Sequence, residues 1–173
     1  MAKKTILTIL LAFFLISLMI GSSLMMDEGE KTEKYKEITF KETSDGWIGY
    51  KENQKIVLQF PPSELEKIES NISNSFWTLS KHYITFLPEE RLITPVNKAI
   101  DLVNNPVIAC IEDQEGCENY PLKDCKDSTQ TIGIIKITES EEQKITLQEN
   151  CLTLQGDITY LSKTIDKLKL DKI

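Results

Sequence analysis

The sequence contains a single histidine, His82, so any mechanism in which an imidazole activates a nucleophile would depend on this one residue. A serine or cysteine nucleophile needs such a base within hydrogen-bond reach. No serine lies in a G-x-S-x-G setting, and neither a Walker-type loop nor a G-x-G-x-x-G run occurs. His82 stands at the start of an expected strand, beside Lys81 and Tyr83, where we expect an exposed or partly hydrogen-bonded side chain.

Basic residues are in the minority, with 20 lysines and arginines against 27 aspartates and glutamates. The first 26 residues hold two of the lysines and no acid, so the remainder carries 18 basic and 27 acidic residues, a net charge of −9. A domain of this charge repels nucleic acid and anionic lipid headgroups. We therefore expect no nucleic-acid partner.

Two common metal-binding patterns are also missing. A structural zinc site needs closely spaced pairs such as C-x2-C, and a calcium loop of the usual kind needs a D-x-D-x-D-G run. Acidic residues do cluster in two places, where solvated loops and calcium binding both fit the sequence. The clusters are formed by Glu112, Asp113, Glu115 and Glu118, and by Glu139, Glu141 and Glu142. We expect no cofactor and no metal.

One long hydrophobic run is present, at the N-terminus. Residues 6–26 include no charge, and these 21 residues are about enough to span a bilayer core. Small residues at 21–23 resemble those that precede a signal-peptidase cut. The run is therefore either a transmembrane anchor or a cleaved signal peptide. Because Lys3 and Lys4 precede it and acids follow it, we expect the rest of the chain outside the cell membrane, attached or secreted.

The remaining chain has the size and composition of one globular domain. Charged residues make up 27% of the sequence and hydrophobic residues 40%, as in ordinary folded proteins, and no internal repeat is present. We expect residues 1–26 to be the signal or anchor, residues 27–37 a charged linker, and residues 38–173 a single extracytoplasmic domain.

The first part of this domain predicts an N-terminal β-meander. Three short runs are rich in aromatic and β-branched residues and are separated by turn residues. They cover residues 35–43, 46–53 and 55–60. Ser63 and Glu66 then form a capping-box pattern, which predicts a helix that buries Leu65, Ile68 and Ile72.

The second part predicts a strand–helix–strand unit, a further strand, a hairpin and a C-terminal amphipathic helix. The expected elements are a strand at 82–88, a helix at 94–105 capped by Thr94, a strand at 106–112 buried on both faces, a strand at 131–138, a hairpin at 143–156 and a helix at 157–170. Because strands and helices are mixed throughout, the fold class is α/β or α+β.

The sequence has four cysteines, Cys110, Cys117, Cys125 and Cys151. Outside the cytoplasm an even number favours two disulfides, with free buried thiols or a metal site as the alternatives. Three pairings are compatible with four cysteines, and we expect Cys110–Cys117 with Cys125–Cys151. Gly116 lets the acidic loop turn back toward Cys110, which leaves Cys125 to tie the following loop to the strand of Cys151.

Several short segments resemble a group of uncharacterised archaeal proteins that are exported or membrane-anchored and have four cysteines. The segments are Ala109-Cys110, Pro121-Leu122-Lys123-Asp124-Cys125, Asn150-Cys151-Leu152 and Ile165-Asp166-Lys167-Leu168. The likeness extends over most of the chain. It implies an extracytoplasmic location and this cysteine layout, and it implies no particular activity.

Together these features predict a disulfide-braced module that binds an envelope protein or ligand, or that has a structural role in the envelope. It would contact the membrane through its N-terminal helix. An extracytoplasmic hydrolase that uses carboxylates or His82 is the alternative. Asn71-Ile72-Ser73 is an N-x-S sequon, which makes Asn71 a candidate glycosylation site.

Overall fold

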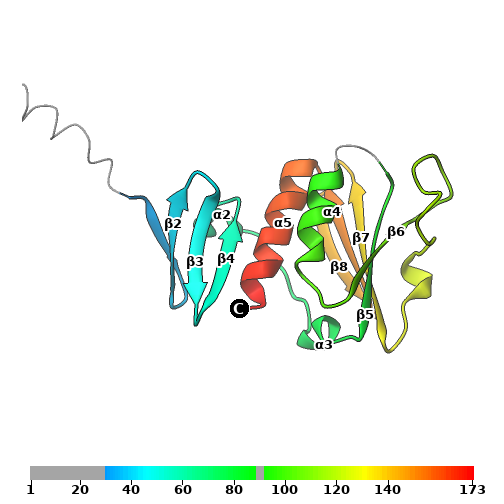
Figure 1. Ribbon diagram of the computed structural model, residues 1–173, viewed down its shortest axis with the longest axis horizontal. Helices are drawn as coiled ribbons and strands as arrows, with labels where there is room; N and C mark the ends of the chain where they lie inside the picture. Colours follow the sequence, from blue (N-terminus) through cyan, green and yellow to red (C-terminus); the bar gives the residue numbers. More distant parts are fainter. Residues whose placement is uncertain (1–29, 89–91) are drawn as a thin grey trace, which may run out of the picture. The chain divides into compact units, whose positions relative to one another are not determined.

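A computed structural model describes residues 30–88 and 92–173 of the chain. Residues 32–173 form one compact unit that contains two β-sheets and several helices (Figure 1). The mixed α+β class is therefore confirmed. The expected N-terminal hydrophobic helix lies outside the described residues, and within them no helix is both long and apolar enough to cross a membrane.

The first sheet is an antiparallel meander of four strands in chain order (Figure 1). The strands are β1 (Thr32–Tyr35), β2 (Ile38–Thr43), β3 (Gly46–Lys51) and β4 (Gln54–Leu58). The expected linker over 27–37 and the expected strand over 35–43 are both wrong in detail. Strand β1 already begins at Thr32, and a tight turn at Lys36, with φ of 52°, separates it from β2.

Alternation along these strands places one set of side chains in a small core. Phe40 and Leu58 are fully buried there, while their neighbours Lys41 and Gln59 are exposed. Such alternation is expected for a sheet that has one buried face and one solvated face.

The short helix α2 (Pro62–Leu65) replaces the longer helix expected from residue 63 onward. The predicted capping box is wrong, because neither side chain caps the helix. The backbone N–H and the hydroxyl of Ser63 instead donate to the carboxylate of Glu33 on β1, at 2.8 and 3.0 Å. Glu33, which is distant in sequence, thus accepts the hydrogen bond from the Ser63 N–H that Glu66 would accept in a capping box. A second short helix, α3 (Asn74–Trp77), follows in a stretch without a clear sequence pattern.

The second sheet has five strands in the order β6-β5-β7-β9-β8. The strands are β5 (Lys81–Phe86), β6 (Pro106–Cys110), β7 (Ile132–Glu139), β8 (Lys144–Gln148) and β9 (Cys151–Gly156). The neighbours β6, β5, β7 and β9 are parallel, and β8 joins β9 as an antiparallel hairpin. This arrangement contains the predicted strand–helix–strand unit, β5–α4–β6, and the predicted hairpin.

Helices α4 (Ile93–Ile100) and α5 (Ile158–Asp171) pack side by side and share a core with one face of the second sheet (Figure 1). Helix α4 differs from the expectation at both ends. Its N-cap position is Leu92 rather than Thr94, and the helix ends at Ile100. Asn105, with φ of 52°, precedes Pro106, and both features oppose further helix.

Strand β6 is an outer strand, and only its last two residues are buried, so the expected burial on both faces is wrong for its first three residues. Its last residue is covered by the loop that follows. Cys110 donates its N–H to the Pro121 carbonyl at 3.0 Å and accepts from the Lys123 N–H at 2.9 Å. The end of this apolar strand is thus buried by the loop at 121–123 and not by a further strand of the sheet.

Helix α5 contributes to both cores. Leu161, Ile165 and Leu168 belong to the core of the second sheet, and Leu170 belongs to that of the first. The Asp157 carboxylate caps the helix by accepting from the Tyr160 N–H at 2.8 Å. A helix with buried residues on more than one side is expected where two layers pack against it.

Candidate functional site

The four cysteines form two disulfides in the expected pairing. Cys110 bonds to Cys117 with 5.9 Å between their Cα atoms, and Cys125 bonds to Cys151 with 5.2 Å. No described cysteine is free. The prediction of disulfide bonds is therefore confirmed, and neither thiolate chemistry nor zinc ligation is open to these side chains while they are oxidised.

The loop from 111 to 131 is fixed onto the second sheet by more than its disulfides. The Lys136 ammonium on β7 lies 2.8 Å from the Asp124 carboxylate, and this contact lowers the pKa of Asp124 below its usual value. The Asp127 carboxylate accepts from the Asp124 N–H at 2.8 Å and closes a short 3-10 turn at Cys125–Asp127. The loop therefore presents a fixed surface.

The acidic side chains of this loop face solvent. Glu112, Asp113, Glu115 and Glu118 are all exposed. The Glu118 carboxylate accepts hydrogen bonds from its own N–H and from that of Gly116, and these bonds lower its pKa. In the part of the chain that the structure describes, no group of three or more His, Cys, Asp or Glu residues is placed to hold a metal ion.

His82 is fully buried, so the expectation of an exposed side chain is wrong. The expectation of a partly hydrogen-bonded histidine at the start of a strand holds, because its Nδ1 has no hydrogen-bond partner among the described residues. Its Nε2–H donates to the Phe76 carbonyl at 2.8 Å, and its ring packs edge-on against the Phe76 ring. Gly133 on the adjacent strand makes room for it, since a Cβ there would lie 2.6 Å from the imidazole Cδ2. Burial lowers the pKa of His82, which is therefore a neutral core residue without access to a substrate.

The sequence did carry a signal for this position. His82 has the same parity in β5 as Ile84 and Phe86, both of which face the core. Because alternate residues of a strand share a face, this parity places the imidazole inside.

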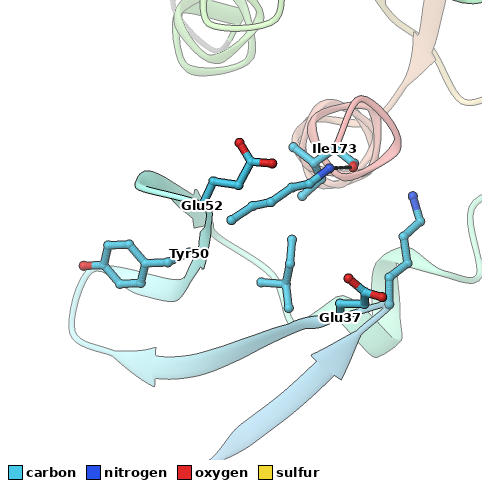
Figure 2. A pocket seen from close by; sticks show the side chains of 7 residues that line it. Glu37, Tyr50, Glu52 and Ile173 are labelled. Carbon is cyan, nitrogen blue, oxygen red and sulfur yellow. Dashed lines mark hydrogen bonds between the residues drawn. The ribbon is translucent and has the colours of Figure 1, made fainter.

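A pocket of about 440 Å³ opens at the end of the first sheet where two of its turns meet (Figure 2). It is lined by Lys36, Glu37, Ile38, Tyr50, Lys51, Glu52 and Ile173. The Lys51 ammonium donates to the Ile173 carbonyl, which joins one side of the pocket to the chain after α5. Tyr50 is 64% exposed, and its ring extends away from Glu37 and Ile173 in Figure 2.

This pocket offers charges of both signs but no nucleophile with a base beside it. Lys36 and Glu52 both occupy turn positions with positive φ, 52° and 47°, where non-glycine residues are uncommon. Apart from Ile173, the pocket residues come from the β1–β2 turn, the β3–β4 turn and the strand ends beside them. Sequence reasoning missed the site because these charges are unremarkable until antiparallel pairing brings the two turns to the same end of the sheet.

Asn71 lies in an irregular segment between α2 and α3, and its side chain is exposed. The middle residue of the sequon, Ile72, is partly buried against the core. The candidate glycosylation site is thus on the surface.

The chain matches no family model, and neither the curated proteins nor the solved structures include a significant match to it.

Proposed function

We propose that this chain is an extracytoplasmic, disulfide-braced module that acts by binding a ligand or an envelope protein. The single observation that carries the proposal is the pair of disulfides, which uses all four cysteines. Disulfides form and persist in oxidising compartments and are rare in the reducing cytosol. A fold that contains two of them is suited to a location outside the cell membrane.

The N-terminal sequence supports the same location. Two lysines precede an uncharged run long enough to span a bilayer, and acids follow it. The archaeal group that the chain resembles is likewise exported or membrane-anchored. The run either anchors the module as a single-pass helix or is removed as a signal peptide.

A binding role fits the chemistry of the candidate site better than catalysis does. The pocket at the turns of the first sheet holds two lysines and two glutamates, which suit a polar ligand with both donors and acceptors. A hydrolase that uses His82 would need this imidazole to reach a substrate, and its burial prevents that. A carboxylate-based hydrolase remains the alternative function.

Protease treatment of intact cells or spheroplasts tests the location. If the module lies outside, added protease digests it while a cytoplasmic marker protein stays whole. Digestion only after lysis would contradict the proposal. Sequencing the N-terminus separates the two forms of export, because a mature start near Leu24 indicates cleavage.

Cosedimentation with envelope fragments tests the binding role of the pocket. Fragments from cells that lack this gene should retain the full chain, and the double variant Glu37→Lys/Glu52→Lys should bind at least several-fold less. Glu112→Lys/Glu115→Lys is the matched control, since it makes the same charge change on the exposed disulfide loop. Equal loss in both variants would indicate nonspecific charge effects and contradict the pocket assignment.

A further inference from the structure

The outward face of the first sheet carries lysines and, within its four strands, no acid. Side chains alternate along a strand, so the neighbours of the buried Phe40 and Leu58 point away from the core. We call these outward residues of β1–β4 the outer face. It consists of three threonines, Gly46 and the six residues Lys34, Lys41, Ile48, Tyr50, Lys55 and Val57.

This face departs from the net charge of the chain. Residues 60–173 hold 12 basic and 19 acidic residues, whereas residues 30–59, which include the first sheet, hold six of each. The two acids in the strands of this sheet, Glu33 and Glu42, belong to the opposite face, and the others lie in the turns or before β1. The repulsion of anionic headgroups that the net charge predicts therefore comes mainly from the second part of the chain.

Aromatic and aliphatic side chains stand between the lysines. Ile48 and Val57 lie opposite each other and are partly exposed, and Lys41 is the next residue of the same cross-strand row. Tyr50 is 64% exposed and lies opposite Lys55. Tyrosine is enriched at the headgroup level of membranes, and lysine stems cover apolar surface while their ammonium groups stay in a polar environment. This combination suits contact with a layer of lipid headgroups.

The sequence places the outer face close to the expected membrane segment. The uncharged run ends at Met26, and the chain enters β1 at Thr32, which belongs to the outer face. A fully extended chain between these two residues spans about 20 Å. Three of the five intervening residues are acids, so attraction to headgroups has to come from the outer face itself.

We propose that the outer face docks on the phosphate groups of the lipid headgroups beside the N-terminal anchor and holds the module flat on the membrane. The proposal rests on the anchored, extracytoplasmic form proposed above. Helix α5 packs on the opposite face, where Leu170 joins the core of the first sheet, so α5 and the second sheet lie away from the bilayer. Attraction between lysine and phosphate is screened over about 8 Å at physiological salt, so docking requires close contact.

Fluorescence quenching of the full chain in lipid nanodiscs tests this orientation. All four native cysteines are in disulfides, so a label on Thr39→Cys, which is exposed on the outer face, reports on that face alone. Gln130→Cys, exposed before β7, is the control position. With a quencher on the headgroups of phosphatidylglycerol bilayers, the Thr39 label should be quenched at least several-fold more than the control label. This excess should vanish in ~1 M salt, where the screening length is about 3 Å. Equal quenching of the two labels, or an excess that salt leaves unchanged, would overturn the proposal.

Charge reversal in the same bilayers gives an independent test. Lys34→Glu/Lys55→Glu should lower the quenching of the Thr39 label at least several-fold. Lys126→Glu/Lys144→Glu makes the same charge change on exposed lysines of the disulfide loop and β8, and should leave the quenching unchanged. Equal loss in both double variants would show that overall charge, and not this face, determines the contact, and would refute docking.

Extraction with alkaline carbonate separates the failure of docking from the failure of the anchor. A chain that stays in the bilayer after extraction but shows no excess quenching contradicts the docking alone. A chain that carbonate removes contradicts the anchored form on which docking rests.

Discussion

At the scale of single residues, Asp166 connects three segments of the fold. Its carboxylate is 1% exposed and accepts from the N–H groups of Gln59 at 2.6 Å and Phe60 at 3.3 Å. The Lys98 ammonium of α4 lies 3.0 Å from it. The chain after β4 and both long helices therefore meet at one buried anion.

Replacing Asp166 with Ala should lower the free energy of unfolding by about 2–4 kcal/mol, since it leaves two amides and an ammonium without their acceptor. Asp101→Asn is the matched control. That carboxylate is 70% exposed and 3.9 Å from Lys169, so its loss should change stability by less than about 0.5 kcal/mol. Denaturant unfolding of both variants measures the difference, and equal effects would show that Asp166 does not hold the segments together.

His82 should make stability depend on pH. Burial lowers the pKa of its imidazole in the folded protein, while the unfolded chain takes up a proton near pH 6.5. The contribution of His82 to the free energy of unfolding is therefore complete above pH 6.5 and is lost as pH falls below it. The unfolding free energy should change by at most about 1.4 kcal/mol per pH unit from this group.

His82→Gln keeps an N–H donor for the Phe76 carbonyl and removes the titration. Unfolding free energies measured from pH 7.5 to 5.5 should fall more steeply for the native protein than for this variant. Parallel curves would mean that the histidine titrates equally in the folded and unfolded states.

At the scale of elements, the two disulfides should differ in their effect. The Cys125–Cys151 bridge spans 26 residues and the Cys110–Cys117 bridge spans seven. The longer closed loop restricts the unfolded chain more, which corresponds to about 3.5 kcal/mol against roughly 2.4 kcal/mol.

Double replacement by alanine of Cys125 and Cys151 should therefore lower the unfolding free energy more than double replacement of Cys110 and Cys117. Denaturant titrations of the two variants measure this difference in unfolding free energy. The reverse order would show that burial of Cys110 and Cys117, rather than loop length, determines the contribution.

Elements with strong local signals were predicted well from the sequence. The β8–β9 hairpin lies within the expected range of 143–156 and turns at Glu149 and Asn150, and α5 matches the expected helix at 157–170 to within one residue at each end. The predictions failed where contacts between residues distant in sequence determine the local structure. The Glu33 carboxylate accepts from the Ser63 N–H and hydroxyl, which are the groups that a capping box would use. The loop at 121–123 covers the end of β6, an outer strand whose apolar sequence predicts burial on both faces.

The candidate pocket could not be predicted in the same way. Its two pairs of charges lie in turns about fifteen residues apart and become neighbours only through strand pairing, since residues near opposite turns share one end of a meander. The cysteine pairing was easier to infer, because a glycine turn next to Cys117 makes a local bridge geometrically simple.

At the scale of the whole molecule, stability should depend on the redox state and not on metal. A chelator such as EDTA should leave the melting temperature of the purified protein unchanged, whereas a dithiol reductant should lower it by well over 5 °C. Elemental analysis provides the control and should find no stoichiometric zinc. A drop in melting temperature with EDTA would indicate a structural metal ion instead of disulfides.

The proposed extracytoplasmic role depends on the cysteines being oxidised in the cell that makes the protein. Thiol trapping in intact native cells, followed by non-reducing peptide mapping, measures this state directly. We predict no alkylated cysteine before reduction, four after it, and two linked peptides that join Cys110 to Cys117 and Cys125 to Cys151. Alkylation of all four cysteines before reduction, or a peptide that joins Cys110 to Cys151, would contradict the account.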